Sequence, residues 1–215
     1  AGGLKAAQVR DFIMDNNEVD NNAAAGLWCD IACRNVTYVN NRVHHNLTQG
    51  ILFEISDGAS IVNNALWENG WGAASAGWGA GIIVSTSSNV DVWGNVLAWN
   101  KDGIAVIEQA RTDGLPVRNI GVHDNTILNT DGAMGLTWRS DTRHLFDAAA
   151  ANRGARNQYW FATTENRQPR FAWSGEWTNL TVFIQTPGDS TGTYLSGAEK
   201  DAVLASHGMP AQHRA

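Results

Sequence analysis

Two acidic residues, Asp30 and Glu54, occupy equivalent places in two short apolar runs of the sequence. Asp30 stands four residues after Gly26 in "GLWCDI", and Glu54 stands four residues after Gly50 in "GILFEI". If the two runs are neighbouring strands, the alternation of side chains directs both carboxyl groups to the same outer face. One inter-strand step of about 4.8 Å would then separate them.

Two carboxyl groups at this spacing suit acid catalysis. At an effective dielectric constant of about 20 their repulsion is on the order of 3 kcal/mol, which raises the second pKa by about two units. One group is then ionised and the other protonated near neutral pH. Retaining glycosidases hold their two carboxyl groups about 5 to 5.5 Å apart, whereas inverting ones leave about 6.5 to 9.5 Å for a water molecule. The spacing therefore predicts a nucleophile beside an acid, in the retaining geometry.

The elements that must position this pair are repeats. An asparagine frame recurs in "DNNEVDNN", "VNNRVHHN", "VNNALWEN", "WGNVLAWN" and "HDNTILNT", and each copy is followed by a glycine that opens an apolar run. Successive glycines are 24, 31, 22 and 32 residues apart: Gly26, Gly50, Gly81, Gly103 and Gly135. These windows lack the 3.6-residue period of helices, and short runs between Asn and Gly corners are typical of stacked strands.

We therefore expect an all-β fold, a right-handed parallel β-helix of about five coils over residues 1–140. Positions one and three after each glycine are apolar and should face the core: Leu27, Ile51, Ile82, Ile104, Leu136, Cys29, Phe53, Val84, Val106 and Trp138. Positions two and four should face outward: Trp28, Leu52, Ile83, Ala105, Thr137, Asp30, Glu54, Ser85, Ile107 and Arg139. The repeated asparagines should stack as a corner ladder: Asn17, Asn41, Asn64, Asn95 and Asn125.

Residues 141–215 lack the repeat and predict a capping segment of mixed helix and strand, in one folding unit with the coils. Ser196 and Glu199 form a capping-box pattern ahead of a short apolar helix, which Gly208 and Pro210 follow. This segment should cover the C-terminal end of the stack. Because no comparable cap precedes the first coil, we expect the other end to be covered by a second subunit of a homo-oligomer or by a preceding half of a longer β-helix.

Charge and composition narrow the choice of partner. The net charge of −6 and the pI of about 5.4 come with no cluster of Lys and Arg, so no nucleic-acid partner is expected. No apolar run reaches the roughly 18 residues of a membrane span, so no membrane partner is expected. Cys29 and Cys33 could form a disulfide only if the chain turns sharply between them, since an extended path of about 13 Å exceeds the limit of about 7 Å between Cα atoms. Both states of the cysteines are therefore kept open.

Aromatic residues near the acidic pair are candidates for substrate binding. Most of the ten tryptophans should be core or stacking residues. Trp28 points the same way as Asp30, and the insertion "GWGAASAGWGA" should carry Trp71 and Trp78 beside the sheet. Three polar residues complete the expected binding set: Lys5 in the Trp28 column, His45 at a corner and Arg139 at the end of the Asp30 column.

The stretch "GLWCDIACRNVTYVNNRVHHNLTQGILFEISDGASIVNNAL" resembles the β-helix β-xylosidases of glycoside hydrolase family 120. The wider pattern is similar to secreted bacterial β-helix repeat proteins of the pectate-lyase-like superfamily. In family 120 the aspartate of Leu-Trp-x-Asp is the nucleophile, and an outward glutamate about one coil later is the general acid/base. The resemblance implies these roles for Asp30 and Glu54, a carbohydrate substrate, no cofactor, and a secreted or periplasmic location.

Two other functions fit the same residues. A polysaccharide lyase acting on uronates would use Lys5, Arg34 or a histidine as the base, beside a calcium ion held by Asp30 and Glu54. A non-catalytic glycan-binding or structural β-helix would instead hold the two carboxyl groups in a salt-bridged face with Lys5 and Arg34. The fold does not decide between them, because β-helices serve all three functions.

Overall fold

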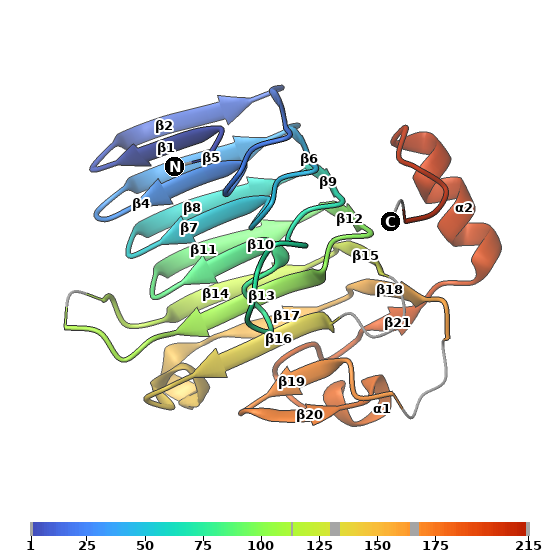
Figure 1. Ribbon diagram of the computed structural model, residues 1–215. Coiled ribbons are helices and arrows are strands. Elements are labelled where there is room, and N and C mark those ends of the chain that lie inside the picture. Colours follow the sequence, from blue (N-terminus) through green and yellow to red (C-terminus); the bar gives the residue numbers. More distant parts are fainter. Residues whose placement is uncertain (1, 113, 130–133, 164–167, 214–215) are drawn as a thin grey trace.

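The chain coils into three parallel sheets that run the length of the molecule (Figure 1). The computed structural model describes residues 2–112, 114–129, 134–163 and 168–213. Within each sheet, neighbouring strands come from successive coils, so that one coil adds one strand to every sheet. This arrangement is a parallel β-helix, as the repeat predicts.

The strands are grouped here by sheet. Sheet A contains β1 (Leu4–Ala7), β4 (Leu27–Asp30), β7 (Ile51–Glu54), β10 (Ala80–Ser85), β13 (Asp102–Glu108), β16 (Met134–Ser140), β19 (Phe171–Trp173) and β20 (Glu176–Thr178). Sheet B contains β2 (Arg10–Asp15), β5 (Arg34–Val39), β8 (Asp57–Val62), β11 (Ser88–Trp93), β14 (Arg118–His123) and β17 (Arg153–Ala155). Sheet C contains β3 (Glu18–Asp20), β6 (Arg42–His44), β9 (Ala65–Trp67), β12 (Val96–Ala98), β15 (Thr126–Asn129), β18 (Gln158–Phe161) and β21 (Thr193–Tyr194).

The inward positions are the ones that the glycine register predicts. All ten residues one and three positions after the repeat glycines belong to a single buried core between the sheets. Cys29 and Cys33 are both buried in this core as free thiols, so they form no disulfide. Burial raises the pKa of the Cys29 thiol to about 12. The cysteines therefore act as small core residues.

The expected asparagine ladder is present and longer than expected. Each side-chain amide donates to the Oδ1 atom of the asparagine one coil further on, at 2.9 to 3.0 Å, from Asn17 through to Asn157. A second ladder runs parallel to it, with amide-to-Oδ1 distances of 2.8 to 2.9 Å along Asn22, Asn46, Asn69 and Asn100. The two ladders mark the two ends of the sheet C strands.

Strands continue past residue 140, where the repeat was expected to stop. After the short helical turns η1 (His144–Phe146) and η2 (Ala148–Ala150), β17 pairs with β14 and β18 pairs with β15. Asn157 takes the next place in the ladder, and Tyr159 and Phe161 point into the core. The structure thus has six complete coils where about five were expected, because β17 and β18 complete the coil that β16 begins.

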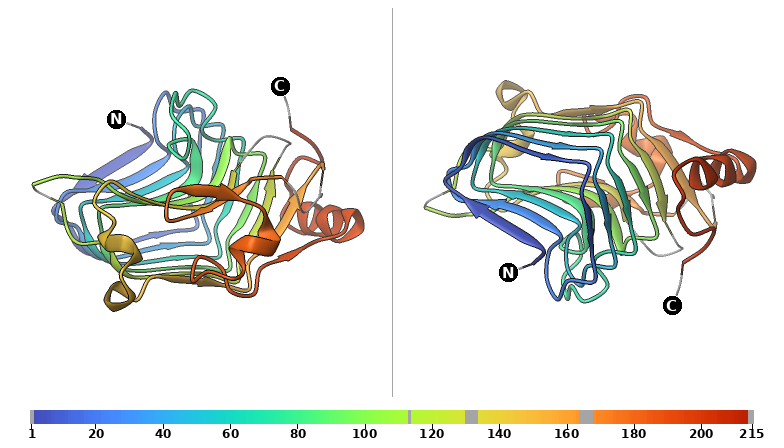
Figure 2. Two further views of the ribbon diagram at one scale, coloured as in Figure 1. Left: turned by 90° about the horizontal axis from the view of Figure 1, so that it is seen from below. Right: turned by 90° about the horizontal axis from the view of Figure 1, so that it is seen from above.

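The two parts of the C-terminal segment pack on different parts of the β-helix. The β19–β20 hairpin and α1 (Leu180–Phe183) close the end of the stack, with Phe171, Leu180 and Phe183 in the core. Helix α2 (Gly197–Ser206) begins with the expected capping box of Ser196 and Glu199. It packs through Leu204 on the outer side of sheet C and not over the end of the stack (Figure 2).

The last ladder asparagine meets a buried acid, Asp189, which gives the first test of the fold. Asn157 Nδ2 and the Tyr159 hydroxyl donate to Asp189 Oδ2 at 3.1 and 2.7 Å. Burial raises the pKa of this carboxyl group, whereas the Tyr159 hydrogen bond lowers it.

Replacing Tyr159 with Phe should therefore cost about 2 kcal/mol of unfolding free energy when Asp189 is ionised, as expected for a lost hydrogen bond to a charged group. The variant raises the Asp189 pKa further, so its cost should grow as pH rises through that pKa and should be smaller at pH 4 than at pH 8. Urea unfolding at both pH values measures this. A cost independent of pH would contradict the role given to the hydroxyl.

Candidate active site on sheet A

Strands β4 and β7 place Asp30 and Glu54 side by side. The two strands pair in parallel, with Leu27 opposite Ile51 and Asp30 opposite Glu54. The same column continues through Ser85, Ile107 and Arg139 on the following coils. The predicted register is confirmed, and the two carboxyl groups are neighbours on the outer face.

Asp30 is held by a lysine from the preceding coil. Lys5 lies opposite Trp28 in the register, and its Nζ atom is 2.8 Å from Asp30 Oδ2. The same Nζ atom lies 3.4 Å from the centroid of the Trp28 ring. Asp30 Oδ1 and Trp28 Nε1 are buried and have no hydrogen-bond partner within the part of the chain that the structure describes. Oδ2 of Asp30 is thus paired with a cation, and Oδ1 is a buried acceptor without a hydrogen-bond donor among the described residues.

Glu54 holds its proton more strongly than an ordinary glutamate. Burial raises its pKa most, and the nearby negative charge of Asp30 raises it further. Arg111, Lys5 and Ser85 lower the pKa without cancelling that rise, and Arg111 Nη1 lies 3.6 Å from Glu54 Oε1. A carboxyl group with a raised pKa beside a second carboxyl group is the arrangement that the acidic pair predicts, whereas the Lys5–Asp30 ion pair is the contact expected of a salt-bridged face.

Arg111 was not anticipated from the sequence. It lies in the segment between β13 and β14, which is longer than the corresponding segment of the other coils. Its side chain extends past β10 to Glu54 at the end of β7. Sequence spacing carries no signal for this contact, because the path of an insertion does not follow the repeat. Arg34, the cation expected beside the pair, lies instead on β5 of sheet B.

An apolar patch adjoins the acidic pair on the same face. Leu52, Ala80, Ile83, Ala105 and Ile107 form a cluster against which Trp28 and Trp78 pack. Trp78 comes from the 70–80 insertion, which folds back across sheet A. The insertion is tied down where Gly77 N donates to Asp102 Oδ2 at 3.0 Å and Arg139 Nη1 donates to the Ala76 carbonyl at 2.8 Å. Trp78 and Arg139 thus reach the expected face, where both make contacts within the protein.

His45 and Trp71 lie elsewhere. They line a separate hollow with Leu47, Glu68 and His213. His213 Nδ1 is 2.6 Å from Glu68 Oε2, and its ring stacks on Trp71 with centroids 4.4 Å apart. The eight residues predicted for the site therefore fall into three groups. Asp30, Glu54, Lys5 and Trp28 lie together. Trp78 and Arg139 lie on the same face of sheet A, and His45 and Trp71 line the second hollow.

The acidic pair does not fit a calcium ion. Calcium takes six to eight oxygen ligands, generally with several carboxylates. Asp30 and Glu54 each face a cationic side chain, because Lys5 lies within ion-pair distance of Asp30 Oδ2 and Arg111 within ion-pair distance of Glu54 Oε1. In the described ranges, no group of three or more His, Cys, Asp or Glu side chains is suited to a metal. The calcium-dependent chemistry of a lyase therefore finds no support in these residues.

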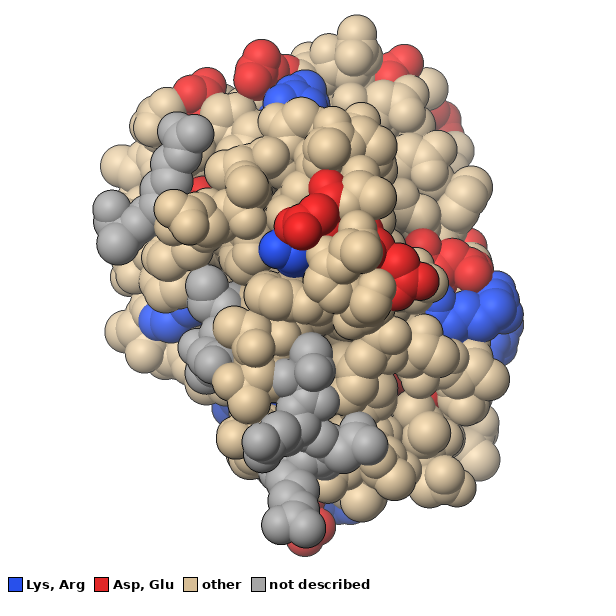
Figure 3. Space-filling model, turned by 90° about the vertical axis from the view of Figure 1, so that its right-hand side faces the viewer, with Lys and Arg blue, Asp and Glu red and all other residues tan. Residues whose placement is uncertain are grey.

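The surface gives further context. The side of the molecule on which α2 lies is formed mostly by uncharged side chains, with small separate groups of acidic and basic ones (Figure 3). Among the residues described, no helix is both long enough and apolar enough to cross a membrane.

Comparison with known proteins supports the fold. Residues 1–97 match the family described as right handed beta helix region. The match covers the first coils, including both acidic residues, and confirms the handedness expected of the parallel β-helix. No curated protein and no solved structure matches the chain.

Proposed function

We propose that this parallel β-helix protein is a carbohydrate-active enzyme, a retaining glycoside hydrolase with Asp30 as nucleophile and Glu54 as general acid/base. One observation carries the proposal: Asp30 and Glu54 are directly paired on adjacent strands, and Glu54 has a raised pKa while Asp30 is paired with Lys5. The strand spacing of about 4.8 Å is close to the separation of about 5 to 5.5 Å in retaining enzymes.

The reaction follows from these two states. Glu54 donates its proton to the glycosidic oxygen while Asp30 Oδ1 attacks the anomeric carbon, so the bond to the leaving oxygen breaks and a glycosyl ester forms. Glu54, now ionised, takes a proton from a water molecule that attacks the same carbon. The ester bond breaks, and both carboxyl groups return to their starting states. Two displacements at one carbon retain its configuration.

The surroundings of the pair suggest how a sugar would be bound. Lys5 and Arg111 cover the carboxyl groups, and their side chains are about one third exposed, at 33% and 35%. A substrate would reach Asp30 Oδ1 by displacing the Lys5 side chain from the Trp28 ring, which would then be free to stack on the sugar. The local resemblance to family 120 suggests a β-xyloside, and with it a secreted or periplasmic location.

A panel of substrates tests the proposal. Aryl glycosides, including the β-xyloside, are assayed for aryl release, and uronic polysaccharides are assayed for unsaturated products that absorb in the ultraviolet. We expect aryl release from at least one glycoside, with NMR showing a first product that retains its anomeric configuration. An inverted product, or turnover only by elimination, would overturn the hydrolase assignment.

The ion pairs at both carboxyl groups favour one alternative, a non-catalytic β-helix in which Asp30 and Glu54 stabilise the outer face with Lys5 and Arg111. Removing one partner of a buried charged pair strongly destabilises the fold, and such a pair needs no catalytic role to be retained. No turnover in the whole panel, together with a loss of stability in carboxyl-to-amide variants, would favour this function.

The pH dependence of activity tests the role of Glu54. Because the protonated acid is required, kcat/KM should fall as pH rises through the raised pKa of Glu54. Arg111 lowers that pKa, so replacing Arg111 with Gln should move this alkaline limb to higher pH. Initial rates across the pH range measure the limb. A limb that stays in place in the Arg111 variant would assign it to another group.

A further inference from the structure

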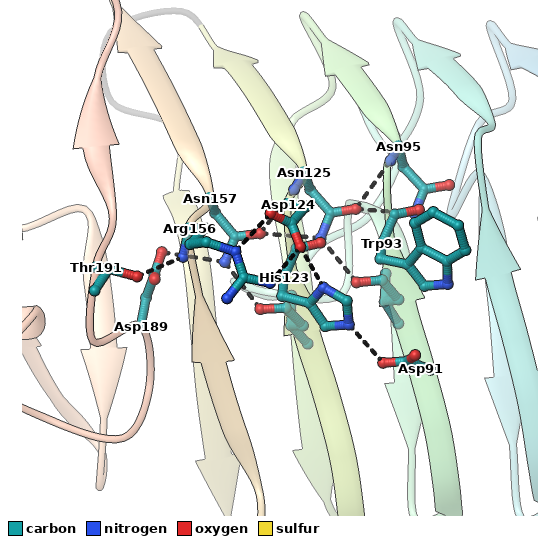
Figure 4. Close-up of polar contacts among 12 residues, drawn as sticks. Asp91, Trp93, Asn95, His123, Asp124, Asn125, Arg156, Asn157, Asp189 and Thr191 are labelled. Atoms are coloured by element: carbon teal, nitrogen blue, oxygen red, sulfur yellow. Dashed lines mark hydrogen bonds and ion pairs between the residues drawn. The ribbon is translucent and has the colours of Figure 1, made fainter.

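The outer face of sheet B carries one exposed and one half-buried aromatic ring that the acidic site does not use. Trp93 ends β11 and is 38% exposed, and it lies opposite His123 of β14. The two rings are parallel to within 3°, with centroids 6.4 Å apart. Figure 4 shows both rings side by side in front of the strands, with their faces turned the same way. Together they form a flat surface across two coils.

The His123 ring is fixed by hydrogen bonds on both sides. Its Nε2 atom lies 3.0 Å from Asp91 Oδ1, and its Nδ1 atom lies 2.6 Å from Asp124 Oδ2 (Figure 4). Arg156 in turn donates to both oxygens of Asp124, at 2.8 and 2.6 Å. A ring held in this way loses little freedom when a ligand binds, which favours affinity.

A hollow adjoins this aromatic surface. Its polar lining consists of Asn89, Asp91, Asn119 and Arg153, with Gly121 between them. Gly121 lies between Asp91 and Arg153 in the register of the sheet. A Cβ atom at this position would come within 2.6 Å of Asp91 Oδ1. The absence of a side chain at Gly121 therefore allows the Asp91 carboxylate to lie over this position, at the wall of the hollow.

We infer that this face of sheet B is a binding site for a neutral oligosaccharide, with Trp93 and His123 as the stacking surface and the hollow at Gly121 receiving an adjacent sugar unit. A sugar ring has an apolar face that packs on aromatic rings and hydroxyl groups that bind carboxylate, amide and guanidinium groups. The carboxylate of Asp91 beside the rings disfavours an anionic ligand. A single-stranded nucleic acid is a poorer candidate, because a site that stacks its bases also needs several cationic side chains along its phosphates.

This inference does not depend on hydrolysis. The aromatic surface belongs to sheet B, whereas Asp30 and Glu54 belong to sheet A. Oligosaccharide binding at Trp93 should therefore remain in a chain that lacks both acidic residues, and a chain with no turnover at all can still bind. Failure of one proposal is thus distinguishable from failure of the other.

Titration of the full chain with defined oligosaccharides tests the site. The unmodified chain and the chain carrying Asp30→Asn and Glu54→Gln are titrated by calorimetry with xylohexaose, cellohexaose and mannohexaose, and with a uronate hexamer as the anionic comparison. We expect binding of at least one neutral hexamer, weakened at least tenfold by Trp93→Ala and measurably by Gly121→Ala. Trp177→Ala is the matched control, because Trp177 is another exposed tryptophan, at 41%, on the β20 hairpin.

The readout includes a probe of the residue itself. The indole N–H signal of Trp93, assigned by its loss in the Trp93 variant, should shift during the titration, whereas that of Trp177 should not. Trp93→Phe retains an aromatic face and should keep part of the affinity if Trp93→Ala fails to fold. Absence of binding by every neutral hexamer, binding of the uronate alone, or equal effects of the Trp93 and Trp177 variants would overturn the inference.

Discussion

Replacing Glu54 with Gln should lower kcat/KM for a glycoside with a poor leaving group by about 10³-fold, because a positioned general acid contributes roughly 10² to 10⁴. The loss should be much smaller for an activated aryl glycoside, whose leaving group needs little protonation. Replacing Asp30 with Asn should lower kcat for both substrates by at least about 10³-fold, since no glycosyl ester can form. Initial-rate kinetics with the two leaving groups separates these roles.

Azide distinguishes the two carboxyl groups further. In the Glu54 variant azide can attack the glycosyl ester without base assistance, so it should restore turnover and yield a glycosyl azide of retained configuration. In the Asp30 variant azide can only replace the missing nucleophile, and its product should be inverted. Equal rescue with the same stereochemistry in both variants would contradict the assignment of roles.

Asp102 provides a matched control for these substitutions. It is a buried acid on the same sheet, with a pKa that burial likewise raises, and it binds Gly77 N in the insertion. Asp102→Asn preserves an acceptor for that hydrogen bond. We expect kcat/KM to stay within about threefold of the unmodified chain, because threefold is well below the effect of removing a catalytic acid. A loss of kcat/KM as large as that of Glu54→Gln would show that replacing any buried acid on this face lowers activity, and would contradict a specific role for Glu54.

The acidic pair could be predicted from the sequence because two periodicities agree on it. The glycines set the register between coils, and alternation along each strand sets which side chains point outward. Once Gly26 and Gly50 are aligned, Asp30 and Glu54 have only one possible relation. The same logic placed the ten core residues and the Lys5–Trp28 pairing, all of which the strand pairing confirms.

The insertions are where prediction from the sequence failed. Arg111 and the 70–80 segment lie between strands, and nothing in the repeat specifies how far they travel or which coil they contact. Trp78 was expected beside the sheet and does reach it, where it packs on Leu52 and its neighbours. His45 and Trp71 were separated from the acidic pair for the same reason, since corner residues leave the strand register.

The second asparagine ladder, in contrast, was visible in the sequence and overlooked. Asn22, Asn46, Asn69 and Asn100 each stand five residues after a first-ladder asparagine. A fixed offset inside a repeat is the same kind of signal as the repeat itself. Six coils rather than five could also have been counted, because "RNQYWF" places Asn157 and two alternate aromatic residues in the frame of the earlier coils.

Replacing Asn95 with Leu should be the most damaging single change to the fold. Asn95 is fully buried, and its Oδ1 atom accepts from the backbone N–H and the side-chain amide of Asn64 at 3.0 and 2.9 Å. Its own amide donates to Asn125 Oδ1 at 2.9 Å and to the Ile61 carbonyl at 2.8 Å. A leucine removes these four hydrogen bonds, each worth about 1 kcal/mol net, and leaves the buried Asn64 backbone N–H without its acceptor, at about 1 to 3 kcal/mol. We expect a loss of at least about 4 kcal/mol, against total stabilities of about 5 to 15 kcal/mol for typical domains.

Asn17 supplies the matched comparison, since it is the same residue type at the exposed end of the same ladder. Its amide donates to Asn41 Oδ1 at 2.9 Å and to the Asp15 carbonyl at 3.2 Å, in contact with solvent. Water can replace the partners that Asn17→Leu removes, so this change should cost about 1 kcal/mol. Urea unfolding at pH 7 measures both variants. Equal costs would mean that the ladder contributes through side-chain volume and not through its hydrogen bonds.

Asn95→Asp keeps the shape of the side chain and isolates the amide donor. The Oδ1 acceptor for Asn64 remains, whereas the second oxygen faces Asn125 Oδ1 and the Ile61 carbonyl, both of which are acceptors. An ionised carboxylate there is buried and repelled, so the folded state should favour its protonated form and the pKa should rise. The variant should then be more stable at pH 4 than at pH 8, because a raised carboxyl pKa in the folded state lowers stability as pH increases. The donor, and not the shape of the asparagine, would then be what the interior of this β-helix requires at every coil.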